Sequence, residues 1–405
     1  MDLLIEPTRL RGTVRPPASK SGLHRALLAA ALADGTSTLE GTDPSDDVNA
    51  TLSAVRALGA SVFCGAEDIR VRGCGGKRLE APIRVDCGRS ASTLRLTIPL
   101  SLALAGGGDF SCDESLLRRP LQPYRDALQS RGVSFTEEEG VLRVRGTLPA
   151  GEYRLTGSVS SQFFSGLLLA LPLTDGVSTL RWTSPPESAG YIGMTVEAQR
   201  NAGVRVESDA GGFFVRPQLY HAFSDRMEAD WSQAAFWLAA ASLGQPLRIE
   251  GMDESSTQPD SAFPALVRLI VEGKTVDLSQ TPDLAPPLAL LAALIPGEHR
   301  FEGCGRLRLK ESDRLETICA ALYALGAMIR SENDRLYVWG CEKLAGGGTV
   351  DAAGDHRIAM MSAISAVACE RPFRLLGADC VSKSYPRFWK EYERLGGKCH
   401  VVSLG

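Results

Sequence analysis

Residues 27–40 read Leu-Leu-Ala-Ala-Ala-Leu-Ala-Asp-Gly-Thr-Ser-Thr-Leu-Glu. An alanine- and leucine-rich run, a glycine and a short threonine-rich run predict a helix, a turn and a strand in that order. The same order returns five more times along the chain, the last time without the glycine. The further copies lie at residues 100–111, 167–182, 238–247, 290–301 and 361–375.

A second feature of the sequence recurs in register with this pattern. Six predicted helices end at a glycine, which is the expected left-handed C-cap, and the chain then continues as a strand. Many of these strands read as hairpins, such as Ser61 to Cys64 with Ile69 to Arg72. Six copies at a spacing of about 70 residues predict a repeated α/β unit, and we favour two lobes with a cleft over a linear stack. The six glycines are Gly59, Gly132, Gly203, Gly273, Gly326 and Gly396.

Composition restricts the classes of function. The 405 residues, 44% hydrophobic and 23% charged, are typical of a soluble globular protein with a large core. A net charge of −4 gives no reason to expect nucleic acid or a membrane as partner. The apolar runs are too short to span a bilayer, and no basic segment precedes an apolar core at the N-terminus. The ten cysteines lack metal-site spacing, so we expect reduced thiols, a cytoplasmic location and no metal.

Hydroxyl and cationic side chains gather where helices of the repeat are expected to begin. In the first half they occur at residues 18–25, 88–95 and 157–162. Helix N-termini with free amides and nearby cations bind anions, although ordinary capping is the simpler use of single serines. The segment 157–162 carries three serines, more than one cap needs, which favours a phosphate-like ligand.

The second half carries a dense charged motif, Lys310-Glu311-Ser312-Asp313-Arg314. On a helix, Lys310 and Arg314 would share a face, although a solvated face laced with ion pairs is the competing interpretation. Asp283 and Glu311 are the acid/base candidates; ion pairing lowers a carboxyl pKa and burial raises it, and the sequence leaves that balance open. The residues alone therefore predict a two-lobed α/β protein that acts on a polyanionic small molecule.

Six motifs, taken in order, resemble those of the EPSP synthases, the 3-phosphoshikimate 1-carboxyvinyltransferase family of enolpyruvyl transferases. The resemblance runs from about Pro7 to Gly397 and is far more specific than any single motif. The motifs are Ser19-Lys20-Ser21 with Arg25, Ser45-Asp46-Asp47, Ser160-Ser161-Gln162, Lys310-Glu311-Ser312-Asp313-Arg314, Asp355-His356-Arg357 and Lys383-Ser384-Tyr385-Pro386.

The resemblance implies transfer of the enolpyruvyl group of phosphoenolpyruvate to the 5-hydroxyl of shikimate 3-phosphate, with release of phosphate. It also implies an α/β (α+β) fold of two inside-out barrels, each made of three βαβαββ repeats around a pseudo-threefold axis. Residues 1–18 with 229–405 would form one lobe and residues 19–228 the other, with the first strand completing the C-terminal lobe. No cofactor is implied, and we expect a monomer.

The family's binding residues map onto this chain motif by motif. Glu311 would give a proton to the methylene carbon, Asp283 would be the base near the 5-hydroxyl, and Lys20 is the third catalytic candidate. Shikimate 3-phosphate would be held by Lys20, Ser21, Arg25, Ser160, Ser161, Gln162, Ser188, Tyr191, Asp283 and Lys310. Phosphoenolpyruvate would meet Lys20, Ala91, Gln162, Arg314, Arg357 and Lys383.

The chain also departs from the family. Arg89 replaces the usual Asn or Glu, and Ala91-Ser92 replaces Gly-Thr. The extra methyl of Ala91 should crowd the phosphoenolpyruvate pocket and reduce sensitivity to the inhibitor glyphosate. Ser115 falls where we expect a phosphoenolpyruvate-binding arginine, and Arg89 or Arg118 is a candidate substitute.

Two alternatives stay open from sequence. The sister enzyme, UDP-N-acetylglucosamine enolpyruvyl transferase, shares the implied fold, but its loop cysteine would fall at Glu114 and Cys112 lies two residues away. The other alternative is a homologue that binds shikimate 3-phosphate and has lost catalysis. Retention of Lys20 and Glu311 argues against it, whereas Ser115 keeps it open.

Overall fold

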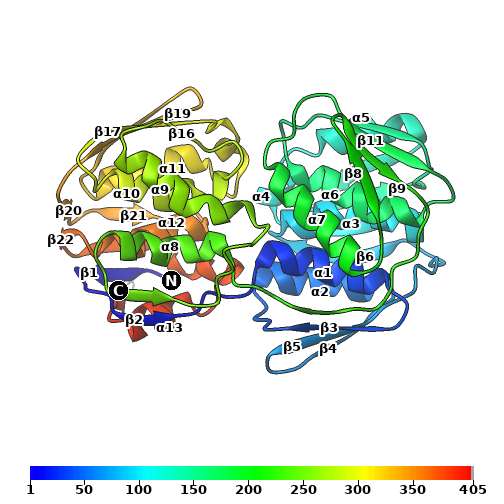
Figure 1. The fold of residues 1–405 in the computed structure, drawn as a ribbon, viewed down its shortest axis with the longest axis horizontal. Coiled ribbons are helices and arrows are strands. Elements are labelled where there is room, and N and C mark those ends of the chain that lie inside the picture. Colours follow the sequence, from blue (N-terminus) through cyan, green and yellow to red (C-terminus); the bar gives the residue numbers. More distant parts are fainter. Residues whose placement is uncertain (403–405) are drawn as a thin grey trace. The chain divides into compact units, whose positions relative to one another are not determined.

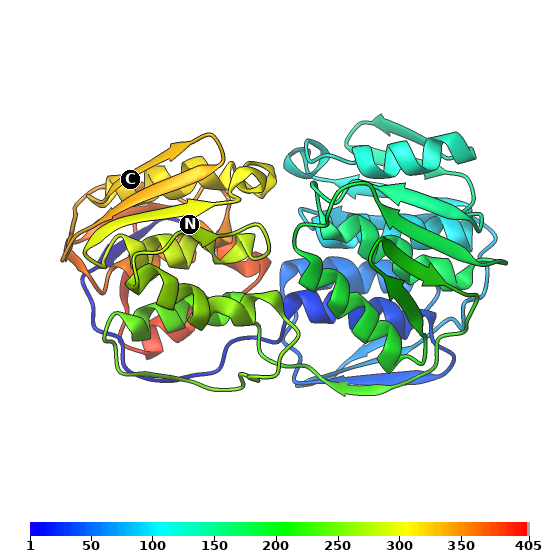
Figure 2. The same cartoon turned by 45° about the horizontal axis from the view of Figure 1, so that its top comes forward.

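The computed structural model describes residues 1–402, and its chain divides into two compact units (Figures 1 and 2). One unit, here the N-terminal unit, comprises Ala18–Glu228. The other, the C-terminal unit, combines Met1–Pro17 with the chain from Ala229 onward. The C-terminal unit is therefore built from both ends of the sequence.

The N-terminal unit contains three four-stranded sheets of one design. In each, the first two strands pair in parallel and the other two pairings are antiparallel. This recurrence confirms the repeated unit. The orders are β14-β3-β5-β4 (Ser224–Arg226, Thr36–Glu40, Asp68–Arg72, Ser61–Cys64), β6-β7-β9-β8 (Ile83–Gly88, Gly107–Cys112, Val141–Arg145, Ser134–Glu138) and β10-β11-β13-β12 (Glu152–Leu155, Ser178–Trp182, Gly212–Val215, Val206–Asp209).

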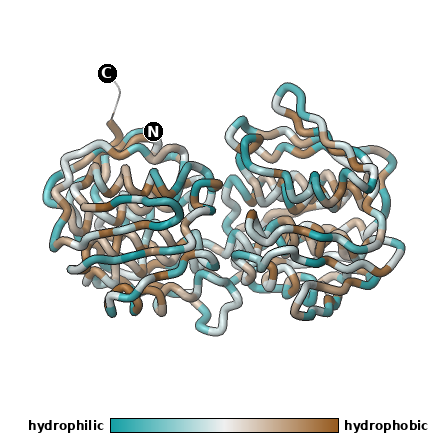
Figure 3. Tube along the Cα trace, turned by 90° about the horizontal axis from the view of Figure 1, so that it is seen from above, coloured by the Kyte–Doolittle hydropathy of each residue, from teal (hydrophilic) through white to brown (hydrophobic). Residues whose placement is uncertain are grey.

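Three helices of this unit are buried on nearly every side, namely α1 (Lys20–Leu32), α3 (Ala91–Ala105) and α6 (Ser161–Ala170). A helix that is apolar all round belongs in the interior, and their many small side chains allow close packing. Strands such as β6 alternate buried and exposed residues, so the sheets cover these helices with one face, and Figure 3 shows the mixed hydropathy along the trace. The other helices of the unit are α2 (Asp46–Ala57), α4 (Glu114–Leu117), α5 (Gln122–Leu128) and α7 (Ala189–Asn201).

The C-terminal unit has two four-stranded sheets of the same design and two short parallel pairs. Its central helices, buried nearly all round, are α8 (Trp231–Ser242), α10 (Ala285–Ala292) and α12 (His356–Ser365), beside α9 (Phe263–Val271), α11 (Arg314–Ala324) and α13 (Phe388–Arg394). The sheets are β16-β17-β19-β18 (Val276–Asp277, Gly297–Glu302, Arg335–Gly340, Met328–Glu332) and β21-β23-β1-β24 (Thr349–Asp351, Phe373–Leu376, Leu3–Glu6, Lys398–Val401). The pairs are β15-β2 (Leu247–Ile249, Gly12–Val14) and β20-β22 (Leu344–Gly346, Cys369–Arg371).

The predicted local signals agree with the structure at most positions. All six helix-ending glycines have positive φ, between 66° at Gly273 and 105° at Gly396. The predicted hairpin pairs Ser61 with Arg72 and Cys64 with Ile69. All ten cysteines are free thiols. Among residues 1–402, no helix has both the length and the apolar character needed to cross a membrane.

One local prediction was wrong. Lys310 and Arg314 do not share a helix face, because α11 begins only at Arg314. The side chain of Asp313 accepts a hydrogen bond from the backbone N–H of Glu316 at 3.2 Å and caps the helix there. An aspartate favours this capping position over a helix interior, so residues 310–313 form the approach to the helix.

Candidate active site

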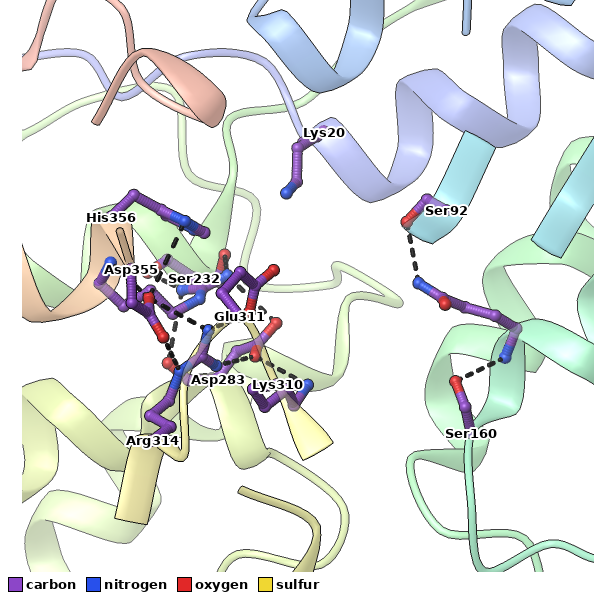
Figure 4. A network of polar contacts seen from close by, with 12 residues as sticks. Lys20, Ser92, Ser160, Ser232, Asp283, Lys310, Glu311, Arg314, Asp355 and His356 are labelled. Carbon is purple, nitrogen blue, oxygen red and sulfur yellow. Dashed lines mark hydrogen bonds and ion pairs between the residues drawn. The ribbon is translucent and has the colours of Figure 1, made fainter. Parts of the chain in front are cut away.

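Four helix starts of the C-terminal unit carry polar side chains that bond to one another (Figure 4). Ser232 lies in the first turn of α8, Asp283 in the 3₁₀ turn Pro282–Leu284 that leads into α10, and Arg314 and Arg357 at the starts of α11 and α12. Helix N-termini carry free amides and partial positive charge. This part of the unit is therefore electropositive before its cationic side chains are counted.

Asp283 is the centre of this cluster. Its carboxylate accepts from Arg314 Nη1 at 2.8 Å, from Lys310 Nζ at 3.0 Å and from Arg357 Nη2 at 3.1 Å. Arg357 Nη2 also donates to Ser232 Oγ at 3.0 Å. Two guanidinium groups and one ammonium thus converge on a single carboxylate.

Arg314 is the most deeply buried of these cations, with 1% of its side chain exposed. Besides Asp283, it donates from Nη2 to Glu311 Oε2 at 2.6 Å and from Nε to Asp355 Oδ2 at 2.8 Å. Asp355 Oδ1 accepts from the backbone N–H of Arg357 at 3.0 Å and so caps α12. Asp355 therefore orients both arginines, because its carboxylate binds the side chain of Arg314 and the backbone N–H of Arg357.

The electrostatic balance left open by the sequence is decided at Asp283. Burial opposes the ionised form, but the three cationic partners outweigh it and hold the pKa of the Asp283 carboxyl well below its usual range. For Arg314, burial is likewise outweighed by its three carboxylate partners, which raise its pKa. Burial lowers the pKa of the Lys310 ammonium to about 8, and Asp283 only partly offsets that effect.

In the N-terminal unit, the starts of α1 and α2 are joined by an ion pair. Lys20 Nζ lies 2.8 Å from Asp47 Oδ2, and both side chains are largely buried. Ser19 caps α1 by accepting from the backbone N–H of Gly22 at 3.2 Å. The serine next to Lys20 therefore serves the helix, while Lys20 itself is oriented by a carboxylate.

Arg25 occupies a polar environment within the same unit. It donates from Nε to Thr195 Oγ1 at 2.8 Å and to the Tyr191 carbonyl at 3.1 Å, and from Nη1 to the Ser21 carbonyl at 2.7 Å. Burial lowers the pKa of its guanidinium to about 10.

Ser188, the N-cap of α7, is buried with a φ of 55°, a left-handed conformation that serine rarely adopts. Such a constraint is typical of a ligand-binding segment.

Gln162, at the start of α6, links two other elements of the unit. Its Nε2 donates to Ser92 Oγ at 2.8 Å, and its Oε1 accepts from Arg95 Nη1 at 3.0 Å. Arg95 Nη2 donates in turn to the carbonyl of Pro120 at 3.0 Å. The side-chain amide is thereby fixed in one orientation, and Ser160 serves as the cap of α6 (Figure 4).

The structure brings together many of the expected site residues within each unit. Asp283, Lys310, Glu311, Arg314 and Arg357 are joined directly. Other expected residues are placed by their elements: Ser161 begins α6, Ala91 begins α3, and Lys383 ends the 3₁₀ turn Ala378–Lys383 and is buried.

Several connecting residues were given no substrate to bind from sequence: Ser232 was not singled out at all, whereas Asp47, Arg95 and Asp355 lie in segments that were. Ser232, Asp355 and Asp47 bind the expected cations, and Arg95 holds Gln162. Their common signal is a polar residue in the first turns of a repeat helix or at its cap. Within residues 1–402, no group of three or more His, Cys, Asp or Glu side chains is arranged to hold a metal ion.

The arginines near the unexpected serine, Ser115, differ in their surroundings. Arg118 is 71% exposed and pairs with Glu114 one helical turn away, so it serves the surface. Arg119 is only partly exposed and directly precedes Pro120, the residue whose carbonyl binds Arg95. Arg119 is thus the nearer of the two to the Gln162 network along the chain.

Comparison with known proteins points to one family. A family model described as EPSP synthase (3-phosphoshikimate 1-carboxyvinyltransferase) matches residues 4–270 and 265–392. The 3-phosphoshikimate 1-carboxyvinyltransferase of Clostridium kluyveri is 37% identical over 422 residues and that of Clostridium botulinum is 36% identical over 427, each alignment covering 99% of both chains.

Solved structures share the fold at lower identity. An EPSP synthase from Acinetobacter baumannii gives a TM-score of 0.81 at 22% identity, covering 99% of this chain and 100% of that one. The enolpyruvyl transferase NikO from Streptomyces tendae gives 0.74 at 18% identity, covering 98% of each chain. These two likenesses support the α/β fold, and the full-length sequence matches go further. The chain belongs to the EPSP synthase, or 3-phosphoshikimate 1-carboxyvinyltransferase, family.

Proposed function

We propose that this protein, a transferase by its family, moves the enolpyruvyl group of phosphoenolpyruvate to the 5-hydroxyl of shikimate 3-phosphate and releases phosphate. The observation that carries the proposal is the carboxylate of Asp283 held between Arg314 and Arg357 at 2.8 and 3.1 Å. A carboxylate or phosphate of a ligand has the charge and the planar or forked acceptors that guanidinium groups bind in pairs.

Shikimate 3-phosphate is assigned to the residues that the family motifs give it. Its phosphate would use Lys20, Ser21, Arg25 and the hydroxyl-rich start of α6 at Ser160, Ser161 and Gln162. Support comes from the fixed placement of Arg25 and from the helix start, whose amides favour a phosphate. Ser188 and Tyr191 would complete the ring contacts, and Asp283 and Lys310 would meet the hydroxyl that attacks.

Phosphoenolpyruvate is assigned to Arg314, Arg357 and Lys383, with Lys20, Ala91 and Gln162 as further contacts. We also propose Arg119, in place of Arg118, as the additional arginine of this set. The support is that Arg119 is next to Pro120 in the chain. Arg95 donates one hydrogen bond to the carbonyl of Pro120 and another to the side chain of Gln162. Arg119 therefore adjoins the Gln162 network, whereas Arg118 is committed to Glu114.

The proposed chemistry is addition followed by elimination. Glu311 gives a proton to the methylene carbon, the neighbouring carbon becomes electron-poor, and the 5-hydroxyl attacks it to form a tetrahedral ketal phosphate. Asp283 accepts the hydroxyl proton; its low pKa keeps it ionised, and a hydroxyl attacking so electrophilic a carbon needs only a weak base. Phosphate then leaves while Glu311 takes a proton back from the methyl group, so the carbon–carbon double bond of the enolpyruvyl ether forms and Glu311 is restored to its starting state.

Binding and catalysis are coupled at Arg314. In the structure Arg314 Nη2 donates to Glu311 Oε2 at 2.6 Å. An anionic ligand that takes over Arg314 would weaken that pair and release the Glu311 side chain. The donor substrate would thereby prepare its own proton source.

A deuterium experiment tests the role of Glu311. In D₂O, the product of the wild-type protein should carry deuterium in its vinyl group by mass spectrometry, because addition and elimination exchange the methyl protons of the intermediate. Glu311→Gln should lower kcat by on the order of 100-fold, the typical contribution of a positioned proton donor. Asp313→Asn is the matched control, since Asn retains the helix cap and Asp313 pairs with Arg308 instead. Equal rates for the two variants would refute the assignment.

We further propose a monomeric, cytoplasmic enzyme. The N-terminal strand β1 completes a sheet of the C-terminal unit within the same chain, and the ten free thiols fit a reducing compartment. Sedimentation of the active protein tests the first point, since a dimer at assay concentrations would contradict it.

A further inference from the structure

A buried set of side-chain hydrogen bonds, here the His24–Ser90 network, runs across three helices of the N-terminal unit. His24 Nδ1 on α1 lies 2.6 Å from Thr51 Oγ1 on α2, and Thr51 Oγ1 lies 2.7 Å from Thr93 Oγ1 on α3. Thr93 Oγ1 donates to Ser90 Oγ at 2.9 Å, and Ser90 caps α3 through the Thr93 backbone N–H. All four side chains are at most 1% exposed. Such a network, buried and continuous, rigidifies what it joins.

The direction of the protons follows from the last members of the network. Thr93 donates its only hydroxyl proton to Ser90 Oγ or, at 3.4 Å, to the carbonyl of Asp47. When Thr93 donates in this way, Thr51 donates to Thr93 and His24 donates from Nδ1 to Thr51. Whatever the direction, Thr51 is the member whose hydroxyl bonds to both α1 and α3.

The ends of the network adjoin residues assigned to the donor substrate. Four residues before His24 is Lys20, and four residues before Thr51 is Asp47, and these two form the ion pair at 2.8 Å. Next to Ser90 are Ala91 and Ser92, and Ser92 accepts from Gln162. The network thus sets the spacing between the Lys20–Asp47 pair and the first turn of α3.

We propose that Thr51 is a positioning residue for phosphoenolpyruvate, acting through the His24–Ser90 network on the distance from Lys20 to the start of α3. The proposal rests on the proposed function. Lys20 and Gln162 are assigned to both substrates, but Ala91, next to Ser90, is assigned to phosphoenolpyruvate alone. Arg25, which is assigned to shikimate 3-phosphate alone, is held outside the network by Ser21, Tyr191 and Thr195. Loss of Thr51 should therefore affect the two substrates unequally.

The test compares Thr51→Val with Thr51→Ser and Thr97→Val in steady-state assays of the full-length protein. Valine removes the hydroxyl and leaves the Nδ1 of His24 and the hydroxyl of Thr93 each short of a partner, whereas serine restores the hydroxyl. Thr97 is the matched control, because it is a fully buried threonine on the same helix as Thr93 and its hydroxyl has no partner among the described residues. The affinity for shikimate 3-phosphate alone is measured by calorimetry, and thermal unfolding shows whether each variant is folded.

Thr51→Val should raise the KM for phosphoenolpyruvate by about tenfold, while the dissociation constant of shikimate 3-phosphate changes by less than about twofold, as expected for residues coupled in one network. Thr51→Ser should restore most of the loss, and Thr97→Val should match the wild type. Adding Thr93→Val to Thr51→Val should raise the KM for phosphoenolpyruvate little further, because the loss of Thr51 already interrupts the network.

Three outcomes would overturn the proposal: Thr51→Val behaves like Thr97→Val, it weakens both substrates equally, or serine fails to rescue it. If the wild-type protein itself releases no phosphate with shikimate 3-phosphate, the proposed function fails, and the role of Thr51 fails with it. That result is distinguished by the inactivity of every protein in the series.

Discussion

In the C-terminal unit, three cationic side chains are oriented by the same carboxylate, that of Asp283. Three cations, Lys310, Arg314 and Arg357, bond to this one carboxylate, so an anionic group that binds these cations must share them with Asp283 or replace it. That these residues belong to the site could be predicted from the sequence, because most of them lie in motifs dense in charge. Their pairing was not, since Asp283, Arg314 and Arg357 lie on separate elements and meet only through the packing of those elements.

Lys310 provides a pH test. Its pKa is lowered to about 8 from 10.5, so it loses its charge as the pH rises through about 8. Above that pH, binding of shikimate 3-phosphate must be accompanied by proton uptake, and its dissociation constant should rise by up to about tenfold per pH unit. Calorimetric titration between about pH 7 and about pH 10 measures this.

Lys310→Arg is the control for this effect, because a guanidinium stays charged across that range. The variant should bind shikimate 3-phosphate with an affinity that changes little with pH. A slope equal to that of the wild type would show that another group is responsible.

Ala91 provides a steric test. It is the first residue of α3, 5% exposed, and its neighbour Ser92 is bonded to Gln162. Removing its methyl in Ala91→Gly should lower the glyphosate concentration for half inhibition by about tenfold or more, since one extra carbon in a filled site costs about 1–3 kcal/mol. Inhibition assays at fixed phosphoenolpyruvate measure this, and an unchanged value would contradict the crowding.

Helix ends are the elements that were predicted best from sequence. Glycine at a left-handed C-cap and serine or aspartate at an N-cap are local effects, so they hold whatever the tertiary structure. The start of α11 was misplaced because the competing signal, a run of charged residues, fits a helix as well as its approach. Only the hydrogen bond from Glu316 to Asp313 distinguishes the two.

Alanine substitutions at two glycines distinguish the effect of backbone strain from that of helix propensity. Gly273 follows α9 with φ of 66°, and no atom lies within 4 Å of the place where a Cβ would stand; Gly193 lies inside α7 with the same open space. Gly273→Ala should lower the free energy of unfolding by about 1 kcal/mol, because a left-handed alanine is strained. Gly193→Ala should raise it by about 0.5–1 kcal/mol through better helix propensity. Calorimetry measures both, and a change of the same sign in both would contradict these assignments.

The chain as a whole was predictable as a repeat, since two independent marks recur in register. The order of helix, turn and strand within the copies indicated the α/β class. Which strands pair could not be derived in the same way, because β1 pairs with β23 and β24 across almost the full length of the chain. Such distant pairing leaves no periodic trace in the sequence, and only the resemblance to the family suggested it.

The place of β1 makes a stability prediction. Ile5 is fully buried in the middle of its sheet, opposite Phe373 on one side and Cys399 on the other. Ile5→Ala should cost about 2–5 kcal/mol, as for other buried isoleucines, and Leu4→Ala, on the opposite and partly exposed face, clearly less. Urea unfolding followed by tryptophan fluorescence suits this test, because four of the five tryptophans belong to the C-terminal unit. Equal losses in the two variants would contradict a core role for Ile5.

The most direct test of the proposed reaction is phosphate release from phosphoenolpyruvate by the purified protein, measured with shikimate 3-phosphate, with UDP-N-acetylglucosamine and with no acceptor. We predict release with shikimate 3-phosphate alone, in amounts equal to the enolpyruvyl ether formed. Release with UDP-N-acetylglucosamine, or no release although shikimate 3-phosphate binds, would contradict the proposed function.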